Sequence, residues 1–237
     1  LFHRLLASEL KSLSEMQNKL LYDTAFFETM LSDLSINVTE MFRDPLFYLA
    51  LRTKVIPILE TYPFIKVWNA GCSSGEEVYS MAILLKEEGL YQRTQIYATD
   101  FNEVILSKAK EGIFPIDCMK QYTSNYIKAG GKNSFSDYYT AKYDSAMIER
   151  DLKTNVVFAD HNLVTDGVFS EMNLIMCRNV LIYFDKKLQN RALNLFCESL
   201  CHGGFLCLGS KESIRFSECA DNFENVVEGQ VIYRKKL

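Results

Sequence analysis

The fold is decided by the stretch FIKVWNAGCSSGEEVYSMAILLKEEG, residues 64–89. Its first six residues are mostly apolar, as in a buried strand, and residues 76–88 are rich in helix-forming side chains and end at Gly89. The turn between them, residues 70–75, consists of small side chains. A strand, a small-residue turn and a helix in this order begin a βαβ unit, so this stretch predicts a parallel α/β sheet.

The same alternation continues along the chain. Residues 95–100 have the pattern of a strand and residues 102–111 that of a helix, with Asn102 as its N-cap and Gly112 at its end. Further strands are expected at 155–159, 173–177, 203–208 and 231–233, and a further helix at 186–200. Before the first strand, apolar spacing predicts helices at 6–21, 24–34 and 46–60, the last interrupted near Pro57.

These elements divide into an N-terminal helical part, residues 1–45, and a larger domain, residues 46–237. Between about residues 114 and 152 the alternation stops, and paired glycines and several tyrosines take its place. We interpret this region as an inserted subdomain with a small structure of its own.

The composition is that of a soluble globular protein, with 48% hydrophobic and 24% charged residues and no apolar run long enough to span a bilayer. We therefore expect no direct membrane insertion. The net charge of −4 and the pI near 5.5 provide no broad basic field, which argues against a nucleic acid as the main partner. The seven cysteines include no CxxC pair, so we expect reduced thiols in the cytoplasm and no metal site.

The turn at residues 70–75 can bring a ligand close to the backbone. It lacks the Gly-Lys-Ser/Thr ending of triphosphate loops and the GxGxxG pattern of dinucleotide loops. Glu76 and Glu77 suit a ligand with an ammonium group, although they can also simply complement the helix dipole. Asp100, at the end of the second strand, can accept hydrogen bonds from two ribose hydroxyls or cap the next helix. Together these features indicate a ligand with a ribose and a positive amino-acid end.

Four segments resemble, in order, the motifs of CheR-type chemotaxis methyltransferases. They are NVTEMFRD at 37–44, NAGCSSGEE at 69–77, ATD at 98–100 and CRNVLIYFD at 177–185. The resemblance implies an α/β fold of the class I S-adenosylmethionine-dependent methyltransferases, which is Rossmann-like, with a seven-stranded sheet whose last strand is reversed. It also implies a short N-terminal helical part and a small inserted subdomain.

The same resemblance implies a function and a site. The function is transfer of a methyl group from S-adenosylmethionine to glutamate side chains on the cytoplasmic helices of bacterial chemoreceptors, giving glutamate methyl esters and S-adenosylhomocysteine. The implied catalytic set is Arg43, Arg178 and Tyr183. The residues implied around the cofactor are Asn37, Thr39, Arg43, Gly71, Glu76, Glu77, Asp100, Asn162, Leu163, Arg178 and Asn179.

The chemistry of these side chains can be stated without the resemblance. The Arg43 guanidinium can hold a carboxylate of the cofactor or of the substrate, or be solvated in a loop. Arg178 and Asn179 directly follow an apolar strand, at the edge where open α/β sheets bind ligands. The Tyr183 hydroxyl could orient a substrate oxygen, or its ring could simply pack.

Methylation of a glutamate requires no proton removal, because the carboxyl group is already ionised near neutral pH. Catalysis should then depend on holding the reacting atoms in line in a desolvated pocket. His161 is therefore left out of the catalytic set. The Cys177 thiol is interpreted as packing, since no activating histidine adjoins it.

The sequence departs from the family pattern in two places. Met41 stands where an aromatic residue is common, and the N-terminal helical part is shorter than the family's substrate-recognition domain. Two other functions stay open: methyl transfer to another protein or a small molecule, and a non-catalytic S-adenosylmethionine-binding signalling module. The insertion corresponds in position to the family's small β-subdomain, and dependence on a receptor tether stays open.

Overall fold

The computed structural model describes residues 5, 7–8, 10–34, 39–215 and 217–236. The chain divides into two compact units, Leu1–Val38 and Thr39–Leu237, which we describe separately. Residues 39–45 were grouped with the N-terminal helical part by the sequence pattern. In the structure they belong to the larger unit, because Met41 and Phe42 are fully buried in its core.

The smaller unit contains helices α2 (Leu13–Tyr22) and α3 (Thr24–Leu34). The hydroxyl of Ser12 accepts a hydrogen bond from the Glu15 N–H and begins α2, as an N-cap does. Met16, Phe26 and Met30 form a small apolar core between the helices. The helix expected at 6–21 was wrong at its start, because residues 10–12 are not helical and the Ser12 cap begins α2 at Leu13. The helix expected at 24–34 is confirmed as α3.

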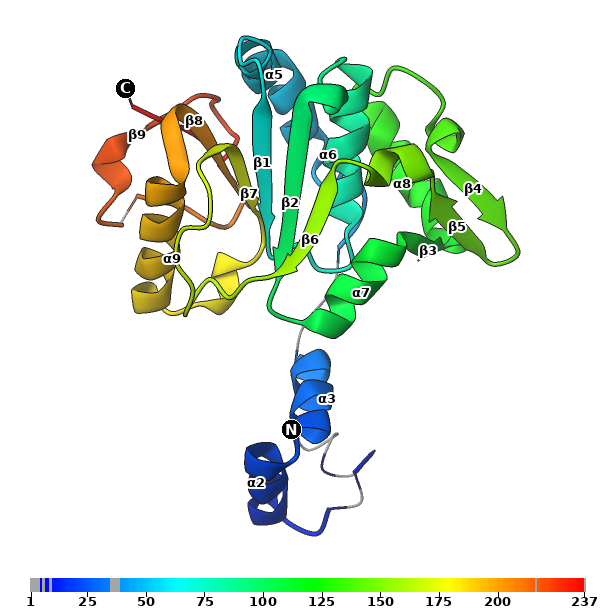
Figure 1. The fold of residues 1–237 in the computed structure, drawn as a ribbon, viewed down its shortest axis with the longest axis vertical. Helices are drawn as coiled ribbons and strands as arrows, with labels where there is room; N and C mark the ends of the chain where they lie inside the picture. Colours follow the sequence, from blue (N-terminus) through cyan, green and yellow to red (C-terminus); the bar gives the residue numbers. More distant parts are fainter. Residues whose placement is uncertain (1–4, 6, 9, 35–38, 216, 237) are drawn as a thin grey trace. The chain divides into compact units, whose positions relative to one another are not determined.

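The larger unit is built on a seven-stranded sheet (Figure 1) with the strand order β6-β2-β1-β7-β8-β10-β9. The strands are β1 (Ile65–Ala70), β2 (Thr94–Asp100), β6 (Val156–Asp160), β7 (Met172–Cys177), β8 (Leu200–Leu208), β9 (Phe223–Asn225) and β10 (Ile232–Lys235). The first five in the spatial order are parallel, and β10 is antiparallel to both of its neighbours. This confirms the predicted sheet with a reversed last strand; only the short β9 was not foreseen.

Alternate residues of the strands enter two separate cores, as the period of a strand requires. Val67 of β1 packs with one cluster, which includes the helices α4 (Pro45–Ala50), α5 (Ile56–Leu59) and α6 (Glu76–Glu87). Trp68 packs with the other cluster, against Phe196 of α9 (Lys186–Ser199). The sheet is therefore buried on both faces, which explains why its strands are almost continuously apolar.

The helices that flank the first two strands begin and end where their capping residues predict. Asn102 accepts the N–H groups of Val104 and Ile105 at the start of α7 (Glu103–Glu111), and Gly112 ends it at φ +60°. The helix expected at 46–60 is interrupted earlier than Pro57 predicts, because a π-helical turn, η1 (Leu51–Val55), separates α4 from α5.

The region after α7 forms a second, three-stranded sheet with the order β3-β5-β4. Its elements are β3 (Ile113–Pro115), α8 (Met119–Lys128), β4 (Tyr139–Lys142) and β5 (Ser145–Ile148). In Figure 1 this small sheet lies beside α8, away from β7 and β8. Sequence alternation did not reveal its strands, because each has only three or four residues.

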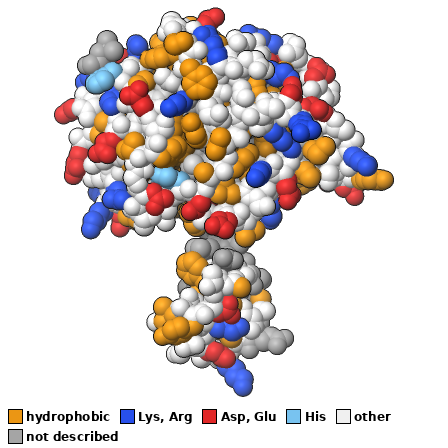
Figure 2. All heavy atoms as spheres, in the orientation of Figure 1, with side chains coloured by type: hydrophobic (Ala, Val, Ile, Leu, Met, Phe, Trp, Pro, Cys, Tyr) orange, Lys and Arg blue, Asp and Glu red, His pale blue; other side chains and the backbone are white. Residues whose placement is uncertain are grey.

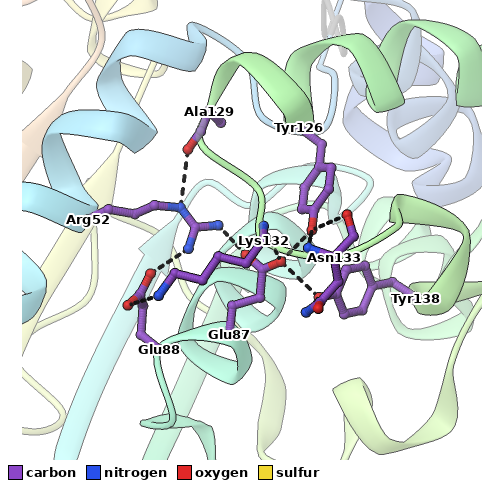
Figure 3. Close-up of polar contacts among 8 residues, drawn as sticks. All are labelled: Arg52, Glu87, Glu88, Tyr126, Ala129, Lys132, Asn133 and Tyr138. Carbon is purple, nitrogen blue, oxygen red and sulfur yellow. Dashed lines mark hydrogen bonds and ion pairs between the residues drawn. The ribbon is translucent and has the colours of Figure 1, made fainter.

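Arg52 of η1 ties this region to the end of α6 (Figure 3). Its guanidinium contacts Glu87 and donates to Glu88 Oε1 at 2.6 Å, and its Nε donates to the Ala129 carbonyl at 3.1 Å. Glu87 also accepts hydrogen bonds from the Tyr126 hydroxyl, the Tyr138 hydroxyl and the Lys132 N–H. Since the Glu87 side chain is fully buried, these donors replace the water that it loses on folding.

The face of the larger unit that Figure 2 shows carries Lys and Arg interspersed with Asp and Glu. Hydrophobic side chains gather between them over the middle of the sheet. Among the described residues, no helix is both long and apolar enough to cross a lipid bilayer.

Candidate active site

The glycine turn after β1 and the carboxylate at the end of β2 form one unit. Asp100 accepts the N–H of Ser73 at 2.9 Å with one oxygen and the N–H of Asn102 at 3.1 Å with the other. The Gly71 N–H donates to the Thr99 carbonyl at 2.8 Å and closes the turn onto β2. Burial raises the pKa of Asp100, while the donated N–H groups oppose that rise. A carboxylate has four lone pairs, so Asp100 can accept further hydrogen bonds, as from ribose hydroxyls, besides those from the backbone.

Position 71 requires glycine for two reasons, its backbone conformation and the lack of room for a side chain. Its φ is +75°, and a Cβ there would lie 2.6 Å from Cγ2 of Val180. The turn after β1 therefore lies directly against the segment that follows β7, as parallel neighbouring strands require.

Arg178 connects three segments at this edge of the sheet. Its Nη1 donates to Glu77 Oε2 at 2.9 Å and to the Arg43 carbonyl at 3.3 Å, and its Nη2 donates to Asp44 Oδ2 at 2.6 Å. The guanidinium lies 4.0 Å from the centre of the Phe47 ring, a cation–π contact. The structure thus brings the 39–44 segment, the first turn of α6 and the end of β7 together.

Arg178 keeps its positive charge in this setting. Burial alone would lower its pKa, but Glu77 and Asp44 hold the pKa above its ordinary value. Burial raises the pKa of Glu77, whereas Arg178 and the Asn69 amide, 3.3 Å from Glu77 Oε1, lower it again. The result is a partly buried charge network at the start of α6.

The Arg43 segment is held in place from its other side as well. The Phe42 N–H donates to the Ser80 hydroxyl at 2.9 Å, and the Phe42 ring packs edge-on against Tyr126 at 5.3 Å. The Asn125 amide of α8 donates to the Met41 carbonyl at 3.1 Å. The inserted region therefore supports the segment that carries Arg43.

Asn179 has a left-handed backbone, with φ at +60°. Its N–H donates to Oε2 of Glu212 at 3.0 Å, and the Gly209 N–H donates to the same oxygen at 2.5 Å. Glu212 is only 7% exposed, and its Oε1 has no hydrogen-bond partner among the described residues. A buried carboxylate thus fixes the residue next to Arg178.

The other expected residues are placed less centrally. Glu76 is buried and accepts the Ser74 hydroxyl at 2.7 Å, and burial raises its pKa. Asn162 follows β6 beside Asp100, and its Oδ1 accepts the Val164 N–H at 2.9 Å. Leu163 is buried in the cluster beneath α9.

Three expected residues remain to be placed. Thr39 is half-buried at the start of the Arg43 segment. The Tyr183 side chain is 58% exposed on the short 3-10 helix η6 (Leu181–Tyr183) that follows Arg178. Asn37 lies outside the described residues.

Neither His161 nor Cys177 is arranged to activate a nucleophile. His161 is 8% exposed, its Nε2 lies 3.1 Å from the Gly167 carbonyl oxygen, and its ring packs against Trp68. Cys177 is fully buried, and burial raises the pKa of its thiol well above the ordinary value. The interpretation of both residues as structural agrees with this geometry.

Residues 37–231 match the family model described as CheR methyltransferase, SAM binding domain. The chain belongs to the CheR methyltransferase family. It is 55% identical to the putative methyltransferase Cher3 of Pseudomonas putida over 235 residues. These residues cover 99% of this chain and 86% of that protein. This CheR chain is thus an S-adenosylmethionine-dependent methyltransferase.

Two other relatives carry the name chemotaxis protein methyltransferase. That of Borreliella burgdorferi is 35% identical over 198 residues, which cover 78% of this chain and 68% of the relative. That of Listeria monocytogenes is 32% identical over 194 residues, which cover 81% of this chain and 71% of the relative.

The residues of the CheR site fit S-adenosylmethionine. Asn69 Oδ1, Arg178 Nε and Glu212 Oε1 are buried polar atoms that lack a hydrogen-bond partner among the described residues. Buried polar groups normally find partners, so their grouping around Arg178 favours a polar ligand there. Asp100 at the end of β2 and the acid-rich first turn of α6 suit a nucleoside with a positively charged amino-acid end.

Sequence reasoning missed three residues of this CheR site. Asp44 was adjacent to the expected Arg43, and Asn69 preceded the glycine turn, so both lay within quoted motifs. Glu212 lies beyond the last motif, 33 residues along the chain from Asn179, with no local pattern to mark it. Only the pairing of β7 with β8 brings it to Asn179.

Proposed function

We propose that the chain transfers the methyl group of S-adenosylmethionine to glutamate γ-carboxylates on the cytoplasmic helices of a chemoreceptor. The products are a glutamate methyl ester and S-adenosylhomocysteine. The support is the family membership together with the relatives named for chemotaxis. The proposed acceptor would place the reaction in the cytoplasm.

The observation that carries this proposal is the Arg178 network beside Arg43. Arg178 anchors the backbone of the Arg43 segment at the carboxyl edge of the sheet, where the donor is expected. We assign Arg43 to holding the acceptor carboxylate, since a guanidinium binds a carboxylate through two parallel hydrogen bonds. Tyr183, exposed beside this edge, is assigned to orienting an acceptor oxygen.

A carboxylate acceptor also agrees with the acid–base groups at the site. The donor, when bound, supplies an electrophilic methyl group. The acceptor is already ionised near neutral pH, so the protein needs no base to generate the nucleophile. His161 and Cys177 are committed to packing, and the chain's task is to orient the acceptor and exclude water.

A different acceptor is the second candidate. The 55% identical relative is named as a putative methyltransferase, and its name specifies no acceptor. The fold alone does not select a substrate, so another protein or a small molecule would use the same donor site. A screen of acceptors with labelled donor distinguishes the two candidates.

The test is transfer of labelled methyl groups to receptor cytoplasmic fragments from the same organism. We expect incorporated label that is released by mild base, as a methyl ester requires. Label that resists base, or labelling of other proteins only, would overturn the proposed acceptor. Arg43→Ala should abolish transfer while the donor still binds; if donor binding is lost instead, Arg43 acts on the donor.

A further inference from the structure

Arg43 is flanked by two residues with a strained backbone. The φ angle is +52° at Phe42 and +58° at Asp44, so both residues are left-handed. This conformation is uncommon outside glycine and is unfavourable for a bulky side chain such as phenylalanine. Strain of this kind persists only where the surrounding structure holds it, and it is concentrated at functional sites. The contacts that hold residues 41–44 therefore determine where Arg43 lies.

Asn125 of α8 makes one of these contacts from the inserted region. The residue is 4% exposed, and its Nδ2 donates to the Met41 carbonyl at 3.1 Å. Gln121, one turn earlier on α8, donates to Asn125 Oδ1 at 2.9 Å. This second bond occupies the amide oxygen, so the NH₂ group of Asn125 stays directed at the Met41 carbonyl.

The Phe42 side chain is held by the same region. It is fully buried, and its ring centre lies 5.3 Å from that of Tyr126 and 6.3 Å from that of Phe135. On the other side, the Phe42 N–H donates to the Ser80 hydroxyl of α6 at 2.9 Å. Residues 41 and 42 are therefore held between the inserted region and α6.

Helix α8 is itself fixed to the rest of the larger unit (Figure 3). The Tyr126 hydroxyl donates to Glu87 of α6, and the Ala129 carbonyl accepts Arg52 Nε of η1 at 3.1 Å. Tyr126 is the next residue after Asn125, and Ala129 lies one turn beyond it. Asn125 is thus presented from a helix whose position is set by buried polar contacts.

We propose that Asn125 is a positioning residue for methyl transfer, which holds the strained segment against α8 and so sets the place of the Arg43 guanidinium. Arg178 donates to the Arg43 carbonyl at 3.3 Å and holds the same segment from the sheet. The inference rests on the proposed function, because Arg43 is assigned there to the acceptor carboxylate. Without the Asn125 amide the segment relaxes from its strained conformation, and Arg43 meets the acceptor in the reactive geometry less often.

The test measures methyl transfer to receptor fragments by Asn125→Leu, in which a side chain of similar size has no donor. We expect KM for the acceptor to rise about tenfold, as the loss of one buried hydrogen bond predicts. The dissociation constant of S-adenosylmethionine, measured by calorimetry, should stay the same. Asn155→Leu is the matched control, because the Asn155 amide donates to the Tyr91 carbonyl at 2.8 Å just before β6, at the opposite edge of the sheet. Its KM should be unchanged.

Gln121→Ala provides a second arm if Asn125→Leu does not fold. Gln121 is exposed, and its removal only frees the Asn125 amide to rotate, so KM for the acceptor should rise about threefold. An unchanged KM in both variants would overturn the proposal. A fall in kcat that only matches a fall in donor-binding sites per chain would also overturn it, because it reports a loss of folded protein.

Hydrogen exchange without any acceptor separates this inference from the proposed function. In Asn125→Leu the N–H groups of residues 42–44 should exchange about tenfold faster, and in Asn155→Leu at the original rate. Unchanged exchange in Asn125→Leu would overturn the proposal whatever the acceptor is. Faster exchange in a chain that methylates no receptor fragment would support the role of Asn125 in holding the segment and contradict only the proposed acceptor.

Discussion

Two buried arginines from other elements, Arg178 and Arg52, each pair with acids at one end of helix α6. The two have nearly the same set of partners. Arg178 contacts Glu77 in the first turn together with Asp44 and one backbone carbonyl. Arg52 contacts Glu87 and Glu88 at the other end together with one backbone carbonyl (Figure 3). Both guanidiniums are almost completely buried.

The two networks differ in what they leave unsatisfied. Arg178 Nε has no hydrogen-bond partner among the described residues, whereas Arg52 Nε donates to Ala129. Asn69 and Glu212, beside Arg178, also retain unpaired buried atoms. We call the Arg52 network saturated, because its buried polar atoms all have hydrogen-bond partners among the described residues, and the Arg178 network unsaturated. A saturated network holds elements together, and an unsaturated one at a sheet edge is suited to bind a ligand. The same side-chain chemistry thus stabilises one end of α6 and prepares the other for function.

The largest expected effect is on stability, at the saturated end. Arg52→Ala would leave the fully buried Glu87 without its cation, and we expect a loss of about 3–5 kcal/mol in the free energy of unfolding. Urea titration followed by circular dichroism measures it. Lys86→Ala, which removes a largely exposed pair with Asp151, should cost about 0–1 kcal/mol. Similar losses of stability in both variants would contradict the proposed difference between the buried and the exposed ion pair.

The next effect is on activity, at the unsaturated end. Arg178→Lys keeps a charge but cannot form the fork to Glu77 and Asp44, so we expect kcat/KM for methyl transfer to fall about 10²-fold. Initial rates with labelled donor measure this. Arg93→Lys is the matched control, because Arg93 donates to two backbone carbonyls elsewhere. If the control lost as much activity, the effect of Arg178 would not be specific.

A smaller effect is expected when Gly71, in the turn after β1, and Gly89, after the end of α6, are each replaced by alanine. Gly71 and Gly89 both have φ near +70°, but a Cβ meets Val180 at 2.6 Å only at Gly71. Gly89→Ala should cost about 1 kcal/mol of backbone strain and leave donor binding intact. Gly71→Ala should also weaken donor binding, as measured by calorimetry, and Val180→Ala should restore part of it. Equal donor affinities in the two alanine variants would refute this.

The smallest effect concerns acid stability. Burial alone would raise the pKa of Glu87, but Tyr126, the Lys132 N–H and Arg52 together lower it below its ordinary value of 4.5. A lowered pKa in the folded state stabilises the fold above pH 4.5, and this contribution is lost as the pH falls through the folded pKa. Glu87→Gln should therefore be less stable than the unchanged chain at pH 7, and this difference in stability should shrink below about pH 4.5.

Melting temperatures of the two proteins across pH 3.5–7 would show this change. The acids near Arg178 behave oppositely, because burial raises the pKa values of Glu77 and Asp100. Their charged forms therefore destabilise the fold, and this destabilisation is relieved as the pH falls. A gap for Glu87→Gln that stayed constant with pH would contradict the role assigned to Glu87.

Local patterns predicted those parts of the fold and site that depend on neighbouring residues. The strand, turn and helix around Gly71 follow from apolar spacing and small residues, and Asn102 and Gly112 mark the ends of α7. Asp100 was identified because it ends a strand. The roles of Arg43, Arg178 and Tyr183 came from motif resemblance and remain proposals.

The sequence by itself determined the order of strands and helices, the glycine turn and the family, because these depend on residues close together in the chain. The tertiary structure alone decided which charges meet. Arg178 reaches Asp44 across 134 residues, Arg52 reaches Glu87 across 35, and Glu212 reaches Asn179 across 33. No local period encodes such contacts, because they form only when elements far apart in the sequence pack together and bury the polar groups between them.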